Sequence, residues 1–257
     1  MLFFWLLLLA HGLADFVLQS DAISSAKCQN KWQGYTRHGL AVFLCTLAAI
    51  HFYGWKGALL AGGLVTMVHL ALDWLKNVGR ALYSKVMKRE ARPGVPGLLI
   101  DQLLHILTLF WVWRLLDKPP VDTTVTGFYA KVLAPLGQFP GAERAVVGLA
   151  VYILVAFGGA VLIRIALDNI FPSDYIVVDG QSTQVTAGKY IGILERILIL
   201  TLTVTGNISA IGVVFAAKSI ARFSELSKKQ FAEYYLVGTL LSFLLALAGG
   251  ILLGQLK

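Results

Sequence analysis

Long apolar segments constrain this chain more than any other feature. Runs of about 20 predominantly apolar residues match the hydrocarbon core of a bilayer, because an α-helix rises about 1.5 Å per residue. Such runs recur along the chain from LFFWLLLLA onward. Of the 257 residues, 57% are apolar and only 14% are charged, too few charges to cover the surface of a soluble protein. The sequence therefore predicts an all-α, polytopic transmembrane helix bundle.

The apolar runs predict eight helical segments, at about residues 2–19, 38–54, 57–76, 98–116, 145–168, 189–205, 207–222 and 232–254. Only Gly206-Asn207 separates the sixth segment from the seventh, so they form either two spans or one broken helix, giving about 7–8 spans. We expect an N-terminal four-helix half at 1–116, an extramembrane loop at 117–144 and a C-terminal half at 145–257. After the fifth helix, residues 174–188 are typical of a short β-hairpin with an Asp179-Gly180 turn.

Basic residues in the loops predict the orientation. Lysine and arginine gather after the first, third and seventh segments, most densely between Arg80 and Arg92. The positive-inside rule makes these loops cytoplasmic, which leaves both termini outside a bacterial-type inner membrane. No basic residue precedes the first apolar run, so we expect a retained helix and no cleavable signal peptide.

The same basic loops account for the net charge of +8. Basic loops face anionic lipid, so the charge predicts the bilayer as partner and no nucleic acid. Gly250 and Gly254 have the GxxxG spacing that lets transmembrane helices approach closely. The pattern predicts a tightly packed bundle and is compatible with a homo-oligomer.

Three helices each carry a histidine and an aspartate four residues apart. The pairs are His11 with Asp15, His69 with Asp73, and Asp101 with His105. Ionisable groups inside a bilayer cost several kcal/mol unless they are paired or hydrated, so each pair is a functional candidate. The spacing puts both side chains on one helical face, which is how a helix presents two metal ligands.

All three pairs are predicted to lie in the cytoplasmic half of the bilayer, and His38 opens its helix at the same level. One site could therefore gather all six side chains as ligands of one metal ion, or of two ions with open positions. Mixed nitrogen and oxygen ligands favour Zn²⁺, with Mn²⁺ or Fe²⁺ as alternatives. We expect catalytic roles for His38, as a ligand or general acid/base, and for Asp73. The alternative is that the pairs are structural hydrogen bonds between helices.

Other polar residues are predicted to support this layer. Gln19, Gln102 and Lys76 fall close enough to orient the ligands. In the C-terminal half, Arg196, Lys218 and Arg222 are candidates to bind an anionic headgroup. For Lys218 and Arg222 the alternative is that the long side chains extend to the lipid headgroups.

Several of these segments resemble a family of uncharacterised bacterial membrane proteins, the domain of unknown function 3307. The resemblance rests on AHGLADFVLQSD, HLALDWLK, IDQLLH and the single His38, and covers roughly residues 1–116. The stretches GKYIGILERILIL, SAIGVVFAAKSIARFSEL and AEYYLVGTLLS are similar to the C-terminal half of longer members. The resemblance implies no activity. More loosely, the His/Asp pairs are similar to those of bacterial membrane-bound metal-dependent hydrolases, although this chain has no HRGxTHS-like stretch.

Three functions are compatible with the sequence. The leading hypothesis is a metal-dependent hydrolase acting on a phosphate-containing or other lipid-like substrate at the cytoplasmic leaflet. The second is a transporter of divalent cations or protons that uses the same His/Asp layer. The third is a non-catalytic scaffold that binds a cytoplasmic partner through a basic loop at residues 76–97.

Overall fold

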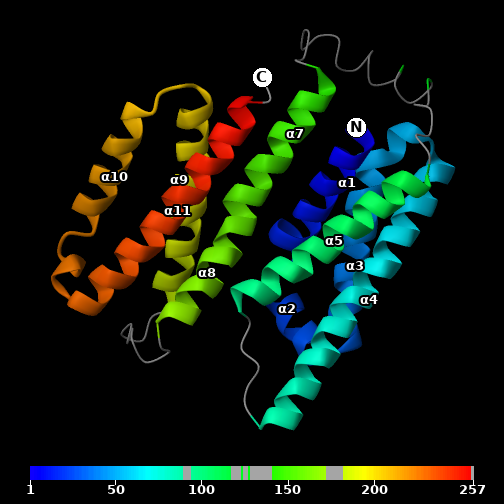
Figure 1. Cartoon of the computed structure of the whole chain (residues 1–257), viewed down its shortest axis with the longest axis horizontal. Helices are drawn as coiled ribbons and strands as arrows, with labels where there is room; N and C mark the ends of the chain where they lie inside the picture. Colours follow the sequence, from blue (N-terminus) through cyan, green and yellow to red (C-terminus); the bar gives the residue numbers. More distant parts are fainter. Residues whose placement is uncertain (89–93, 117–122, 124–126, 128–140, 172–181, 256–257) are drawn as a thin grey trace. The chain divides into compact units, whose positions relative to one another are not determined.

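The computed structural model describes residues 1–88, 94–116, 123, 127, 141–171 and 182–255 (Figure 1). These residues form helices and no strands, which confirms the all-α class. The chain divides into two compact units, residues 1–150 and 151–257, and each is described by itself. The predicted three-part division of the chain stays a prediction.

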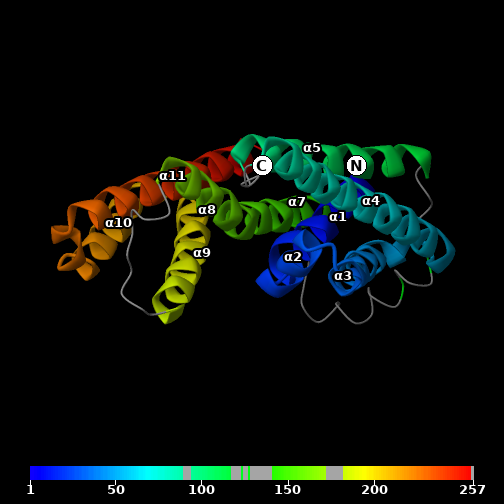
Figure 2. The same cartoon turned by 90° about the horizontal axis from the view of Figure 1, so that it is seen from below.

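The N-terminal unit is built on a closed ring of four helices. These are α1 (Leu2–Gly12) with its π-helical extension η1 (Leu13–Leu18), α3 (Trp32–Ile50), α4 (Trp55–Met87) and α5 (Val95–Leu115). Helix α1 packs against α3 and α5, and α4 packs against the same two helices (Figures 1 and 2). Side chains on the inner faces of all four helices therefore meet at the centre of the ring.

Local signals explain where these helices begin and turn. The Ser20 hydroxyl accepts a hydrogen bond from the backbone N–H of Ile23 and caps the short α2 (Asp21–Cys28), which lies at 92° to α1. The 3-10 turn η2 (His51–Tyr53) ends at Gly54, whose φ of +88° favours glycine. Pro96 stands in the first turn of α5, where its missing N–H costs nothing.

Helix α4 is longer than the predicted segment 57–76. It has 33 residues, and about 20 of them are enough to cross the hydrocarbon core. A stretch of that length counted from Trp55 ends close to Lys76. The prediction of a loop at 76–97 is wrong as far as Met87, because good helix formers carry α4 beyond the apolar region.

The C-terminal unit contains the end of α7 (Ala142–Ile153), the π-helix η4 (Leu154–Gly158), α8 (Gly159–Ile170), α9 (Ser182–Val204), α10 (Ser209–Ala221), η5 (Glu225–Ser227) and α11 (Lys229–Gln255). Helix α11 packs against α8 and α9. Small residues allow this approach: a Cβ atom on Gly250 would lie 2.5 Å from Cβ of Thr203.

The boundary between α9 and α10 shows two helices that fold back on each other. Gly206 reverses the chain with a φ of +78°, and Glu195 pairs with Lys218 across the two helices. Helix α10 has 13 residues, which is shorter than the roughly 20 of a full span. The predicted β-hairpin at 174–188 is wrong where it can be compared: residues 182–188 are the first turns of α9, and 174–181 lie outside the described residues.

Four described helices are long and apolar enough to cross a membrane. They are Trp55–Met87, Val95–Leu115, Ala142–Ile170 and Lys229–Gln255, and the bent pair Leu2–Leu18 with Asp21–Cys28 would make a fifth. Large apolar side chains remain exposed along them, such as Met67 and Leu252. A soluble protein rarely exposes so much apolar surface, so the chain is a multi-pass membrane protein.

The missing side chain of Gly34 lets α2 approach α3 closely, which gives a first testable prediction. A Cβ atom on Gly34 would lie 2.7 Å from the backbone nitrogen of Lys27 and 2.9 Å from Cβ of Ala26. We expect Gly34→Ala to destabilise the protein by about 1–3 kcal/mol, because backbone atoms cannot yield to the methyl group. Gly63→Ala is the matched control, since nothing lies within 4 Å of its added Cβ. The control should stabilise α4 by about 0.5–1 kcal/mol. Equal thermal stability of the two variants in detergent would contradict the packing described here.

Candidate metal centre

Four histidines meet inside the N-terminal ring, one from each helix. His11 comes from α1, His38 from α3, His69 from α4 and His105 from α5, and each is at most 3% exposed. The centroid of the His69 ring lies 4.2 Å from that of His105, 4.9 Å from that of His38 and 5.4 Å from that of His11. The structure thus shows what the sequence left open, namely that the helices that carry these histidines are neighbours.

Four ligand atoms converge beside these rings. The Nε2 atoms of His38 and His69 are 2.8 Å apart. Asp15 Oδ1 lies 3.4 and 3.3 Å from these two nitrogens, and Asp73 Oδ2 lies 3.6 and 3.8 Å from them. Zinc bonds of about 2.0–2.2 Å in a tetrahedron place the ligand atoms about 3.3–3.6 Å apart. The nitrogen–oxygen separations of 3.3–3.8 Å are near this range, whereas the two imidazole nitrogens are closer together.

The buried carboxylate oxygen of Asp15 faces the nitrogens of His38 and His69. This Oδ1 atom makes no hydrogen bond with good geometry to any described residue, despite the two close imidazole nitrogens. Buried polar atoms are rarely left without a partner. Asp15 stands in the π-helix η1, a local widening that often occurs at functional sites. This oxygen belongs to one of the groups of side chains that could hold an ion.

The remaining two histidines are each oriented by one polar partner. His105 Nδ1 lies 2.8 Å from the backbone carbonyl of Asp101 and is therefore the protonated nitrogen. Its buried Nε2 has no hydrogen-bond partner among the described residues. His11 Nε2 faces Gln102 Oε1 at 3.2 Å, and its Nδ1 lies 3.8 Å from Asp15 Oδ1. Fixing one nitrogen so that the other is free is how ligating histidines are oriented.

Lys27 joins the site although the sequence analysis placed it in a loop. Its side chain is buried by α2, and Nζ donates to Asp73 Oδ2 at 2.5 Å and to Gln19 Oε1 at 2.8 Å. The available signal was the Ser20 cap, which predicts a short helix but not its 92° turn toward the ring. Gln19 therefore orients an ammonium group that is bound to a candidate ligand.

Lys76 binds the second oxygen of Asp73 and the carboxylate of Asp101. Its Nζ lies 3.0 Å from Asp73 Oδ1 and 2.9 Å from Asp101 Oδ2. The Lys76 side chain is 33% exposed, against 4% for Asp73 and 11% for Asp101. Lys76 is thus the most exposed of the described charged side chains in the cluster.

Three overlapping groups in the described residues could hold an ion. They are His11 with Asp15 and His69, His38 with His69 and Asp73, and Asp73 with Asp101 and His105. The six ligands predicted from sequence are thus brought together, with His38 among them. The first and second groups share His69, and the second and third share Asp73. Both residues lie on α4, which makes α4 the central element of the site.

The basic residues predicted to bind an anion lie in the other unit, each with its own partner. The Arg196 guanidinium donates to the Ala156 carbonyl in η4 and to the Ser242 hydroxyl. Lys218 Nζ lies 2.6 Å from Glu195 Oε2, and Arg222 Nη1 lies 2.6 Å from Glu225 Oε2. Their role toward a substrate stays a prediction.

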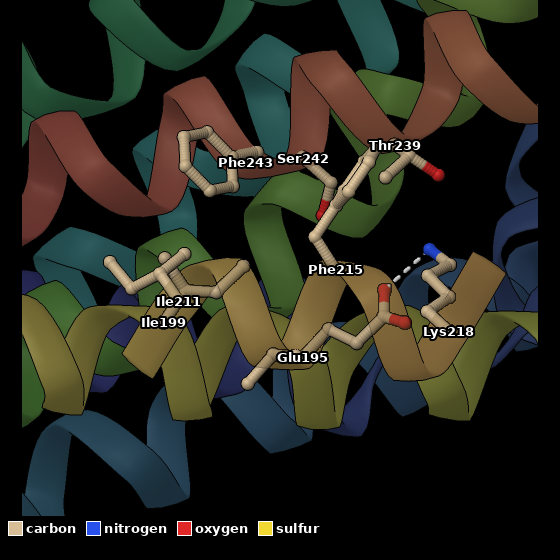
Figure 3. Close-up of a pocket in the computed structure, with 9 residues that line it drawn as sticks. Glu195, Ile199, Ile211, Phe215, Lys218, Thr239, Ser242 and Phe243 are labelled. Carbon is tan, nitrogen blue, oxygen red and sulfur yellow. Dashed lines mark hydrogen bonds and ion pairs between the residues drawn. The ribbon is translucent and has the colours of Figure 1, made fainter. Parts of the chain in front are cut away.

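A small cavity lies beside the pair of Lys218 and Glu195. Figure 3 shows the two charged groups facing each other below Ser242 and Thr239, with apolar side chains such as Phe243 completing the lining. The volume is about 20 Å³, room for about one water molecule. A lipid headgroup would not fit there while the ion pair is closed.

The comparisons with known proteins agree with the resemblance found in the sequence. No curated protein and no solved structure matches the chain. A family model does match, over a region that includes all four cluster histidines, both lysines and the three aspartates. Residues 3–129 of this chain belong to the family described as protein of unknown function, DUF3307.

Proposed function

We propose that the N-terminal unit is a membrane-embedded metal-dependent hydrolase that acts on a phosphate-containing, lipid-like substrate. The observation that carries the proposal is the convergence of Asp15 Oδ1, His38 Nε2, His69 Nε2 and Asp73 Oδ2 in a buried site. Three helices supply these atoms. A purely structural layer would pair its hydrogen bonds, whereas here several buried polar atoms lack partners among the described residues.

The donor set supports a divalent transition metal, and Zn²⁺ most of all. Two imidazole nitrogens and two carboxylate oxygens form a donor set that suits Zn²⁺, while Mn²⁺ and Fe²⁺ accept the same kinds of atoms. Such an ion activates a bound water and polarises a phosphoryl oxygen. His38 and Asp73 would then act as ligands, and Lys27 and Lys76 would supply positive charge beside the reacting group.

The membrane topology that we propose places this site at the cytoplasmic leaflet. It has about 7–8 spans, with α1–η1, α3 and α9 added to the four long apolar helices and α10 as the incomplete one. When α10 is counted as the eighth span, the basic end of α4, which carries Arg80 and Lys85, would project into the cytoplasm of a bacterial inner membrane, and both termini would lie outside. The exposed end of Lys76 would then meet lipid headgroups.

A proton or cation transporter is the second candidate. The four rings form a continuous chain of contacts from His11 through His105 and His69 to His38, and such chains serve as proton relays. The described contacts connect these four rings to one another and to the aspartates beside them. Ion flux in proteoliposomes, without turnover of any lipid, would favour this candidate over the hydrolase.

The hydrolase proposal predicts that metal content and turnover are lost together. Wild-type protein in detergent should contain stoichiometric metal by mass spectrometry and release phosphate from phosphatidic acid in mixed micelles. His38→Ala should lose both, with turnover lowered by at least about 10²-fold, the upper end of what removal of a supporting residue costs. His51→Ala is the matched control, because His51 lies outside the cluster, half-buried in η2.

Two outcomes would contradict the proposal. Wild-type protein that binds none of Zn²⁺, Mn²⁺ and Fe²⁺ after reconstitution would rule out the metal centre. Full turnover by a folded His38→Ala variant would separate the activity from these ligands.

A further inference from the structure

The third ion-binding group, Asp73 with Asp101 and His105, already contains a cation of the protein's own. Lys76 Nζ binds Asp73 Oδ1 at 3.0 Å and Asp101 Oδ2 at 2.9 Å. Those oxygens belong to two of the three residues that would otherwise hold a second ion. An ammonium group in contact with both carboxylates repels a metal ion that would bind beside it, because like charges a few ångströms apart interact strongly in a low-dielectric interior.

The charge balance leads to the same limit. The aspartates at 15, 73 and 101 bring three negative charges, and the two lysines bring two positive charges. One divalent ion changes the net charge of the cluster from minus one to plus one. A second would leave three positive charges in a low-dielectric interior, where each uncompensated charge costs several kcal/mol.

The two oxygens of Asp73 face different cations. Oδ2 faces Lys27 and the two imidazole nitrogens, while Oδ1 faces Lys76. One carboxylate therefore joins the converging ligand set to the ammonium of Lys76. In sites with two metal ions, a bridging carboxylate holds the ions about 3.5–4 Å apart to clamp a phosphoryl group.

We propose that the centre takes a single divalent metal ion and that Lys76 fills the second cation position. In that position its ammonium group binds an anionic oxygen of a tetrahedral phosphoryl substrate, which reaches it through the exposed end of the side chain. This inference rests on the proposed function, since it assigns a residue to substrate binding at that metal centre. Lys76 is a point charge with three donors, so a phosphoryl oxygen can join Asp73 and Asp101 around it.

The test is metal stoichiometry in full-length protein, measured in detergent against buffered free Zn²⁺. Wild type should bind one ion per chain. Lys76→Ala should bind two, because it frees Asp73 Oδ1, Asp101 and His105, and adding Asp101→Asn to that variant should return the value to one. Lys76→Arg is the charge-retaining control and should stay at one. Inhibition of lipid turnover by inorganic phosphate should weaken by at least about tenfold in Lys76→Ala.

The outcomes separate this inference from the proposed function. Wild type that binds two ions per chain overturns the inference and leaves the hydrolase standing. Wild type that binds none removes the metal centre itself. A folded Lys76→Ala variant that still binds one ion, with unchanged inhibition by phosphate, shows that Lys76 neither excludes a second cation nor meets the substrate.

Discussion

Asp73→Ala is expected to lower the free energy of unfolding by about 3–5 kcal/mol. Asp73 is 3% exposed, and Lys27, which lies 2.5 Å from its Oδ2 atom, is 5% exposed. Removing the carboxylate leaves the Lys27 ammonium buried with Gln19 as its remaining hydrogen-bond partner in the described structure. A buried charge without a counter-ion costs far more than the net value of the ion pair.

The double variant Lys27→Met, Asp73→Leu removes both charges and should recover most of that stability. Replacing a buried ion pair with apolar residues of similar volume is often neutral or stabilising. The measurement is chemical unfolding in detergent for the two single variants and the double variant. Asp21→Ala, at an exposed position of the same short helix, should cost less than about 1 kcal/mol. Additive losses in the double variant would contradict the buried ion pair.

The same double variant distinguishes the metal centre from a scaffold. A scaffold depends on the fold alone, so a stable double variant should keep any partner binding. A metal centre loses one of its four converging ligand atoms, so metal content and lipid turnover should both fall while the protein remains folded. Stability and function are thereby measured separately at one pair of residues.

The central part of the site could be predicted from sequence because membrane physics limits where charge is placed. His/Asp pairs with four-residue spacing lie on one helical face, and their position along each apolar run gives their depth. These two facts anticipate the layer that His11, His69 and His105 form. They do not determine which helices are neighbours, because that depends on how the faces of α1, α3, α4 and α5 pack into a ring.

What the sequence analysis missed depends on local geometry that periodicity does not encode. Lys27 reaches Asp73 because α2 turns by 92° and Gly34 allows its backbone to approach α3. Nothing in the apolar sequence around Asp15 predicts that this segment forms a π-helix. The extension of α4 to Met87 was missed for a different reason: hydropathy ends where the bilayer ends, whereas helix propensity continues beyond it.

Metal removal is expected to lower the melting temperature of the wild-type protein by about 5–10 °C. A ligand that binds only the folded state stabilises it by about 2.7 kcal/mol when its free concentration is 100 times Kd. In a chain of this size each kcal/mol shifts the midpoint by about 2–4 °C. The measurement is a thermal melt in detergent with a chelator, and then with increasing free Zn²⁺. Each tenfold rise above Kd should add about 1.4 kcal/mol.

The dependence on Zn²⁺ should vanish in His69→Ala, since His69 belongs to two of the three groups that could hold an ion. It should persist in His51→Ala, which tests for binding to histidine in general. If the wild-type melting temperature does not change with Zn²⁺, Mn²⁺ or Fe²⁺, the metal proposal fails. The buried Asp15 Oδ1 and His105 Nε2 atoms would then serve proton transfer and not a metal ion. The four contacting imidazoles would then be the relay, and ion flux would become the activity to measure.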